Sequence, residues 1–415
     1  MGLEVQDGSR YKPPAKLRFE YHIGRLEQLF WISLIIISCI LPVSNFFTGQ
    51  PTSYVPAILI YSTFLIRILL FSSIGFAISK HLLLPLGILV SIYTAHGLLG
   101  VLSNSVAPFA KGLAFAFFIL VNLFIIPRTI NFEIFVDTLS KVLFGIVCIG
   151  LLGISTDLGF QAISARNLPY FNISIPVFTS VVHNVNAFGR LAGVGFVASI
   201  VSYDISHSKR YLVIGSVLGL GLITTTARSS IIAAVSVLFF YWLYWSGNGH
   251  TAINWVLISL VGGICVFAST IFLTLIGTSV PITFSKRNVY WAGAVKVAFN
   301  SPILGTGPVD TASYIGNYIT GIQRTAHNSF LRAFVTTGVI GGLSFTYLFY
   351  SGLCSAVSSV RNSNFYSVTV GKIALFYFII IELMLSSFSI VGLRLSSVVG
   401  AITLGFVVKP TIPDN

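Results

Sequence analysis

The sequence predicts an all-α fold, a polytopic membrane helical bundle with about 12 transmembrane helices. Composition gives the first two reasons, because 55% of the 415 residues are hydrophobic and only 8% are charged. The third reason is that about a dozen apolar runs approach the roughly 17–25 residues of a spanning helix. So few charges cannot cover a water-soluble globule, and lipid cannot satisfy an open backbone. A single transmembrane domain over residues 28–408 is therefore expected.

The spans follow the apolar runs in order, and polar or glycine-containing segments separate them. They are expected at 28–46, 55–78, 82–103, 107–126, 139–155, 185–203, 211–226, 229–245, 252–277, 328–352, 370–388 and 392–408. An even count puts both chain ends on one side. The basic tail 1–27 places that side in the cytoplasm, together with the tail 409–415. Four cysteines lie singly along these runs, so no disulfide is expected.

The outer face expected from this topology is unusually basic. Its Lys and Arg residues are Lys111, Arg166, Arg190, Arg228, Lys286, Arg287, Lys296, Arg324, Arg332 and Arg394. Only Asp157 and Asp310 oppose them there, in different loops. Divalent-metal sites usually need carboxylates close together, whereas arginines bind phosphate directly. The pattern predicts metal-independent chemistry on a phosphate-bearing substrate, without a cofactor or a nucleic-acid partner.

Two outer loops are long enough to hold a substrate. The first, 156–184, contains Arg166 among asparagines and aromatic residues that suit sugar hydroxyls. The second, 278–327, is the expected active loop. Its candidates, with the first residue of the next span, are Arg287, Trp291, Gly305, Gly307, Arg324, His327 and Asn328.

The spacing in the second loop resembles that of a known family. The pattern consists of Arg287-x3-Trp291, Pro302-x2-Gly305-x-Gly307 and His327-Asn328-x2-Leu331-x6-Gly338-x2-Gly341. It looks like the signature of the O-antigen ligase and polymerase superfamily, over about 55 residues. The polar break Thr224–Ser230 resembles the family's upstream arginine motif, although Ala227 stands where the family more often has Ser.

The resemblance implies a GT-C-like membrane glycosyltransferase in the bacterial inner membrane. Such an enzyme takes a glycan from a polyprenyl (undecaprenyl) diphosphate carrier on the outer, periplasmic face and transfers it to a sugar hydroxyl. It implies catalytic roles for His327, Arg287 and Arg228. Substrate binding is expected from Trp291, Gly305, Gly307, Arg324, Asn328 and Arg166. A chain-length regulator and a flippase of the same pathway are expected partners, together with membrane lipid.

These residue types suit that chemistry. Guanidinium groups stabilise the charge that develops on a diphosphate leaving group, by roughly 3–4 kcal/mol for one preorganised donor. A histidine that titrates near neutral pH can accept the proton of the attacking hydroxyl. Direct attack inverts the anomeric centre. The amides of Gly305 and Gly307 are expected to approach the diphosphate.

Three functions remain open. A polymerase of O-antigen, capsule or exopolysaccharide repeats is preferred, and an O-antigen ligase that uses lipid A core is the alternative. The third is a transporter, because Arg67 and Glu382 both fall inside expected spans. Uncompensated charges there are costly, so we expect these two residues to pair with each other. Such a pair would be typical of an ion or proton path.

Overall fold

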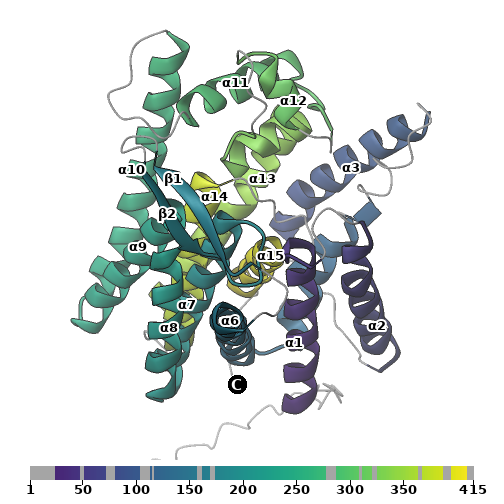
Figure 1. Ribbon diagram of the computed structural model, residues 1–415. Helices are drawn as coiled ribbons and strands as arrows, with labels where there is room; N and C mark the ends of the chain where they lie inside the picture. The colour runs from purple at the N-terminus through teal and green to yellow at the C-terminus, as the bar shows by residue number, and fades with distance from the viewer. Residues whose placement is uncertain are drawn as a thin grey trace, which may run out of the picture.

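Long apolar helices dominate the computed structural model (Figure 1), as the sequence predicts. The structure describes residues 24–46, 51–71, 80–102, 113–114, 116–156, 161–168, 173–276, 287–307, 311–319, 325–362, 367–386 and 394–408. Within these ranges, nine helices are long and apolar enough to cross a membrane. Three shorter apolar helices are Ala116–Thr129, Arg210–Thr224 and Leu395–Val408. The prediction of a helical membrane bundle is confirmed.

The first half of the chain supplies seven of the described helices. Its helices are α1 (Arg25–Ile40), α2 (Val55–Phe71), α3 (Lys80–Leu102), α5 (Ile126–Thr129), α6 (Phe132–Ser155), α7 (Val185–Ser206) and α8 (Arg210–Thr224). Two 3-10 turns, Leu41–Val43 and Pro51–Tyr54, and a π-helical segment, Val121–Ile125, complete it. Helices α6, α7 and α8 pack against one another, and α1 packs against α6.

The second half supplies the central helix of the molecule. Its helices are α9 (Arg228–Trp245), α10 (Gly249–Leu275), α11 (Arg287–Asn300), α12 (Thr311–Gly316), α13 (Ser329–Asn362), α14 (Ser367–Leu385) and α15 (Leu395–Val408). Helix α14 packs against α7, α9, α13 and α15, and 67% of its apolar window is buried. Helix α10 is buried over only 17% of its window, so it presents most of its surface to the surroundings.

Both predicted outer loops contain regular structure that the sequence analysis did not anticipate. The loop 156–184 forms an antiparallel hairpin of β1 (Ile163–Leu168) and β2 (Ile173–Phe178). The loop 278–327 contains α11 and α12. Helix α11 buries Tyr290 and Val297 in a small second core with Ile315 and Val335. This core attaches the active-loop helices to the first turns of α13.

The expected ion pair between Arg67 and Glu382 is not formed. Arg67 Nε instead lies 3.0 Å from Glu27 Oε1, at the start of α1. Glu382 lies in the last turn of α14 and contacts other residues. The prediction was wrong because an apolar run gives the depth of a charge only coarsely and does not identify its neighbours. The transporter interpretation loses the pair on which it rested.

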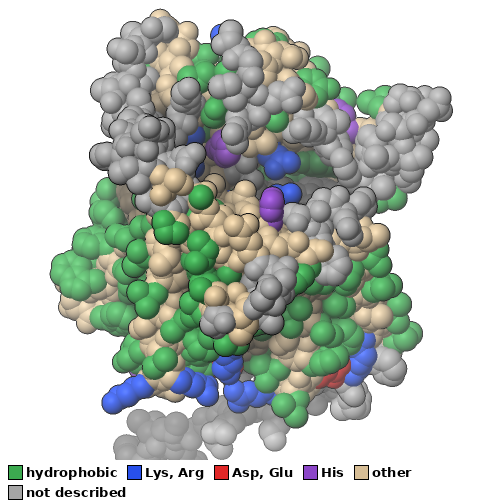
Figure 2. Space-filling view, in the orientation of Figure 1, with side chains coloured by type: hydrophobic (Ala, Val, Ile, Leu, Met, Phe, Trp, Pro, Cys, Tyr) green, Lys and Arg blue, Asp and Glu red, His purple; other side chains and the backbone are tan. Residues whose placement is uncertain are grey.

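Charged side chains gather at two ends of the bundle (Figure 2). A row of Lys and Arg lies along the lower end of the view, with a small acidic patch. A second group of Lys, Arg and His side chains surrounds a hollow in the upper half, below α11 and α12. The band between these groups is largely hydrophobic on this face, as a membrane-spanning surface requires.

Candidate functional site

A buried carboxylate lies at the upper end of the bundle. Glu382, in the last turn of α14, is 1% exposed. Its Oε2 accepts a hydrogen bond of 3.0 Å from Ser386 Oγ. Ser230, in the first turn of α9, lies beside the Glu382 carboxylate. Between Ser230 Oγ and Glu382 Oε1, the geometry does not meet that of a hydrogen bond. A buried negative charge is stable only beside positive charge or hydrogen-bond donors.

Arginines from α7 and α11 supply that positive charge. Arg190, in the second turn of α7, and Arg287, the first residue of α11, both interact electrostatically with Glu382. Arg394, immediately before α15, lies close enough to Arg190 to repel it. Two guanidinium groups therefore share the Glu382 carboxylate, and a third lies near Arg190. Among the described residues, this group carries net positive charge, which suits an anionic ligand.

The end of α14 also fixes the residues of the active loop. The last carbonyl groups of a helix lack partners within it. Arg287 Nη1 donates to Leu385 O at 2.6 Å, and Asn328 Nδ2 donates to Met384 O at 2.8 Å. Ser329 Oγ donates to Ser386 O at 2.8 Å. The starts of α11 and α13 are thereby held against the same helix end.

His327 lies at the junction that precedes α13. Its φ of 48° is in the left-handed region, which side chains other than glycine rarely adopt. The neighbouring Asn328 is 1% exposed, and its Oδ1 caps α13 by accepting from the Leu331 N–H at 2.9 Å. The His327 ring is half-buried, with its centroid 6.1 Å from that of Tyr290 on α11. The imidazole thus lies beside the helix that Arg287 begins.

Arg228 is the exposed first residue of α9. The turn before it contains Thr226 at a φ of 53° and a hydrogen bond of 3.1 Å from Ala227 N–H to Thr225 Oγ1. This turn packs closely against α7, where a Cβ on Gly189 would collide with Ala227. Arg228 therefore begins a helix whose first turn also carries Ser230, the residue beside Glu382.

The two glycine motifs of the sequence pattern meet in the structure. Helix α13 is interrupted at Gly338, where φ is 68° and ψ is −170°. The segment 302–307 lies against this break, and Val339 N–H donates to Pro302 O at 2.7 Å. The Gly305 N–H donates to Ser301 O, and the Gly307 N–H donates to Thr336 O. The expectation that these two amides bind a diphosphate is therefore not met in this arrangement.

Trp291 also differs from its expected role at the sugar-binding surface. Its side chain is 2% exposed, and its ring packs edge-to-face on Phe267 of α10 at 4.5 Å. A buried ring has no free face for a sugar, so Trp291 anchors α11 to α10 instead. The sequence showed an aromatic residue beside an arginine but not the direction in which the ring points.

The other two predicted residues contribute less to the described geometry. Arg166 lies on β1, opposite Ile175 of β2. Arg324 lies outside the described residues. Among the residues that are described, no three His, Cys, Asp or Glu side chains gather as metal ligands would. The structure thus brings Arg287, His327 and Asn328 together at the end of α14.

Sequence reasoning missed Arg190 and Glu382 as members of this site. The signal was available, because an ionisable residue inside an apolar span is a functional candidate by default. The sequence does predict that Glu382 lies inside a span, but with Arg67 as its partner and not Arg190 or Arg287. Arg190 was counted among the outer basic residues and given no role.

Comparison with known families gives one match. Residues 211–346 match a family model described as O-antigen ligase. This segment is about a third of the chain, and it includes Arg228, Arg287 and His327. Arg190, Glu382 and Arg394 lie outside it. Comparison with curated proteins yields no match.

Proposed function

We propose, from the match of residues 211–346 to a family model described as O-antigen ligase, that this chain is a polysaccharide polymerase of the O-antigen ligase and polymerase superfamily. The enzyme transfers a glycan from a polyprenyl diphosphate carrier to a sugar hydroxyl of a carrier-linked repeat unit. It acts at the outer face of the bacterial inner membrane, with both chain ends in the cytoplasm. The polymer is an O-antigen, a capsule or an exopolysaccharide.

The observation that carries this proposal is the group of arginines at the end of α14, beside His327. Arg190, Arg287 and Arg394 bring more positive charge than Glu382 can balance. A diphosphate brings the missing negative charge, and arginines bind phosphate oxygens in bidentate geometry. Because these guanidinium groups supply the compensating charge, we propose that the reaction needs no metal ion.

The proposed reaction has a single transfer step. His327 accepts the proton of the acceptor hydroxyl while its oxygen forms a bond to the anomeric carbon. The bond from that carbon to the diphosphate oxygen breaks, and the carrier diphosphate leaves with the electron pair. Arg287 and Arg228 stabilise the charge that develops on the leaving oxygen. Attack opposite the leaving group inverts the anomeric centre.

A purified-enzyme assay tests this proposal. A synthetic polyprenyl diphosphate oligosaccharide is incubated with wild type and with His327→Ala, and products are separated by length. Loss of a general base lowers such rates by about 10²- to 10⁴-fold. Lys296→Ala is the matched control, because Lys296 is an exposed cation on α11 and lies on the same helix as Arg287. Wild-type rates in His327→Ala would reject this assignment of the base.

An O-antigen ligase is the second candidate, and the description of the matching family favours it. A ligase transfers finished polymer from the carrier to lipid A core, with the same leaving group. A deletion strain separates the two. Single repeat units on lipid A core, without polymer, support the polymerase. Polymer that accumulates on the carrier supports the ligase.

The polymerase requires other proteins of its pathway. A flippase must deliver the carrier-linked repeat to the outer face, and a chain-length regulator is expected to act on the growing polymer. Membrane lipid surrounds the enzyme and its substrates. These partners follow from the proposed reaction.

A further inference from the structure

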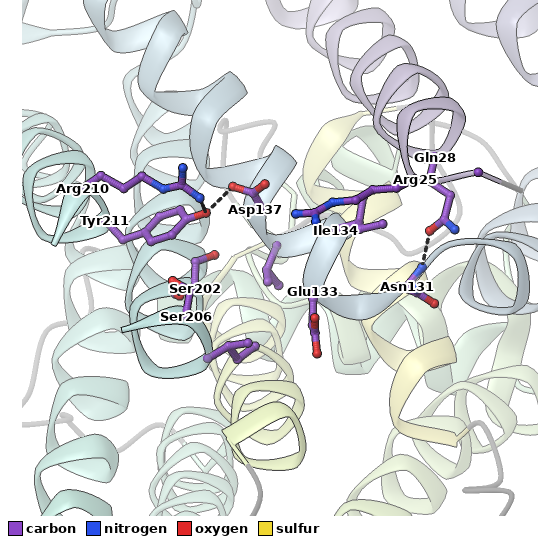
Figure 3. Close-up of a pocket in the computed structure, with 13 residues that line it drawn as sticks. Arg25, Gln28, Asn131, Glu133, Ile134, Asp137, Ser202, Ser206, Arg210 and Tyr211 are labelled. Carbon is purple, nitrogen blue, oxygen red and sulfur yellow. Dashed lines mark hydrogen bonds between the residues drawn. The ribbon is translucent and has the colours of Figure 1, made fainter. Parts of the chain in front are cut away.

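A polar cavity of about 460 Å³ lies far from the arginine site, at the lower end of the bundle. Its walls come from the start of α1, the start of α6, the end of α7 and the start of α8 (Figure 3). The proposed reaction uses none of these residues. The cavity lies where these helices begin or end, which is the level of lipid head groups for spanning helices.

The charges that line the cavity are balanced. Arg25 of α1 and Arg210 of α8 provide two cations, and Glu133 and Asp137 of α6 provide two carboxylates. The carboxylates are separated by one helical turn, so they lie on one face of α6. A ligand with only negative charge would be repelled by the Glu133 carboxylate, with Asp137 beside it. A ligand with one positive and one negative group would satisfy both pairs.

Part of this wall is already ordered by internal contacts. Tyr211 Oη donates to Asp137 Oδ1 at 2.5 Å, and it accepts from Arg210 Nη2 at 2.9 Å (Figure 3). Lys141 Nζ lies 2.7 Å from Asp137 Oδ1. The Arg210 guanidinium retains further N–H donors, since it carries five. Arg25 extends from α1 toward α6 in the same view.

A buried donor in the cavity wall has no partner. Ser202 of α7 lines the cavity and is 4% exposed, yet its Oγ makes no hydrogen bond in the described structure. Buried hydroxyl groups are nearly always hydrogen-bonded, because desolvation without a partner costs about 1–3 kcal/mol. An oxygen-rich ligand or water would satisfy it. Apolar side chains also reach this end of the bundle, since Ile134 and Ile205 line the cavity and Leu26 is 82% exposed.

We propose that this cavity binds the head group of a zwitterionic phospholipid with a primary ammonium, that is, a phosphatidylethanolamine. Its phosphate is held by Arg25 and Arg210, and its ammonium by Glu133 with Asp137 beside it. The acyl chains run along the apolar surface near Leu26. The balanced wall favours this head group over one with phosphate alone.

Native mass spectrometry of the delipidated full-length protein tests the proposal. Equal amounts of phosphatidylethanolamine, phosphatidylglycerol and phosphatidylcholine are added separately, and the bound lipid is measured. Phosphatidylethanolamine is expected to bind best, because phosphatidylglycerol lacks the ammonium and phosphatidylcholine has no N–H to donate. Arg25→Gln and Glu133→Gln are expected to bind it about tenfold more weakly, as for loss of one charge-assisted hydrogen bond.

Lys209→Gln is the matched control, since Lys209 is an exposed cation that precedes Arg210 but does not line the cavity. It is expected to bind like wild type. Arg25 and Glu133 are exposed, so these variants are expected to fold. Three results would overturn the proposal: equal binding of phosphatidylglycerol, unchanged binding in both variants, or equal competition by free glycerophosphoethanolamine or inorganic phosphate. The last result would indicate a soluble phosphate compound, and not a lipid, as the ligand.

Discussion

Glu382 organises the candidate site although it does not resemble a catalytic residue of the proposed reaction. It is buried, and the charges that face it come from α7 and α11. This carboxylate supplies counter-charge to Arg190 and Arg287. We therefore interpret Glu382 as a positioning residue, which orients the guanidinium groups to which we assign the diphosphate.

Glu382→Gln is expected to destabilise the protein strongly. Removal of one partner from a buried charge group typically costs roughly 3–5 kcal/mol, because the remaining charge stays buried. Thermal unfolding in detergent measures the effect. Glu27→Gln is the matched control, because Glu27 and Arg67 form a pair whose side chains are 30% and 24% exposed. Because this pair is only partly buried, loss of its charge should destabilise the protein less than loss of the fully buried Glu382 charge. Equal destabilisation by both variants would contradict the role given to Glu382.

Arg287→Lys distinguishes two roles of Arg287. One is its hydrogen bond to the end of α14, and the other is its proposed part in the reaction. A lysine can still donate to the Leu385 carbonyl group, so the unfolding temperature should change little. It cannot bind phosphate in bidentate geometry, so turnover should fall by on the order of 10²-fold. The kinetic assay of lipid diphosphate transfer measures this, with Lys296→Arg as the control. An unfolding temperature that falls while turnover per folded enzyme is unchanged would leave Arg287 a purely structural role.

Individual residues were predictable where a local pattern fixes them. The spacing around Arg287 and His327 identified both, and the structure brings their helices to the same place. Arg190 and Glu382 are 192 positions apart in sequence and meet only because α7 packs against α14. Hydropathy along one chain contains no information about that contact. For the same reason the sequence could not show that Trp291 points inward.

At the scale of elements, the break in α13 explains several glycines of the motif. Its carbonyl groups near Gly338 would lose their regular partners, and the segment 302–307 supplies replacements. Thr306 N–H donates to Val335 O at 2.8 Å, and Gly307 N–H donates to Thr336 O at 3.0 Å. The glycines of the pattern thus allow the backbone of the active loop to pack closely against α13.

Gly338→Ala is expected to destabilise this junction. The backbone there lies in a region that only glycine adopts readily, at a typical cost of 1–3 kcal/mol for another residue. An added Cβ would also collide with the Ile303 carbonyl group. Gly262→Ala in α10 is the control, because nothing lies within 4 Å of its added Cβ. Alanine favours helix by up to about 1 kcal/mol, so this variant should unfold no earlier than wild type. Equal thermal stability of both variants would argue against strain at Gly338.

Predictions for elements succeeded where apolar length decides the structure. The expected span at 185–203 and the observed α7 agree closely, because a long apolar run has few alternatives in lipid. The hairpin of β1 and β2 was missed because its pairing depends on contacts across the turn. The segment after β2 pairs with the segment after the turn Leu41–Val43 through a bridge between Ser44 and Val182, which are far apart in sequence. The sequence did not predict α11 and α12, because these helices are too short or too polar to be recognised as membrane-spanning segments.

At the scale of the whole molecule, the chain has two polar ends with different charge. The upper end has Arg190 and Arg287 beside one buried acid, with Arg394 near Arg190. The lower end has a row of Lys and Arg with a small acidic patch, and it includes the cavity of Figure 3, where two cations and two carboxylates line the wall. A hydrophobic band separates them on the face that Figure 2 shows. The positive charge beside Glu382 is unusual for the face that the topology predicts to be the outer one, and it is compatible with the anionic substrate that we propose.

Cysteine labelling of intact cells tests this orientation. In a background without the four native cysteines, Lys296→Cys should react with a membrane-impermeant maleimide. Lys209→Cys should react only after the cells are opened, because it lies at the predicted cytoplasmic end. Both lysines are exposed, so access should depend on the side of the membrane. The reverse pattern would place the arginine site inside the cell and contradict the proposed use of an externally delivered carrier.

The shared anchorage of α11 and α13 on α14 has a consequence for motion. Arg287, Asn328 and Ser329 each donate one hydrogen bond to the end of α14. The three acceptors are successive carbonyl groups. A tilt of α14 would carry the guanidinium and the neighbouring imidazole as a unit, while α7 and α9 stay behind. The distance between the His327 imidazole and the Arg287 guanidinium would stay the same. The distances from these two groups to Arg190 and Arg228 would change. Under the proposed function, the carrier lipid would then enter and the lengthened glycan would leave without separating Arg287 from His327.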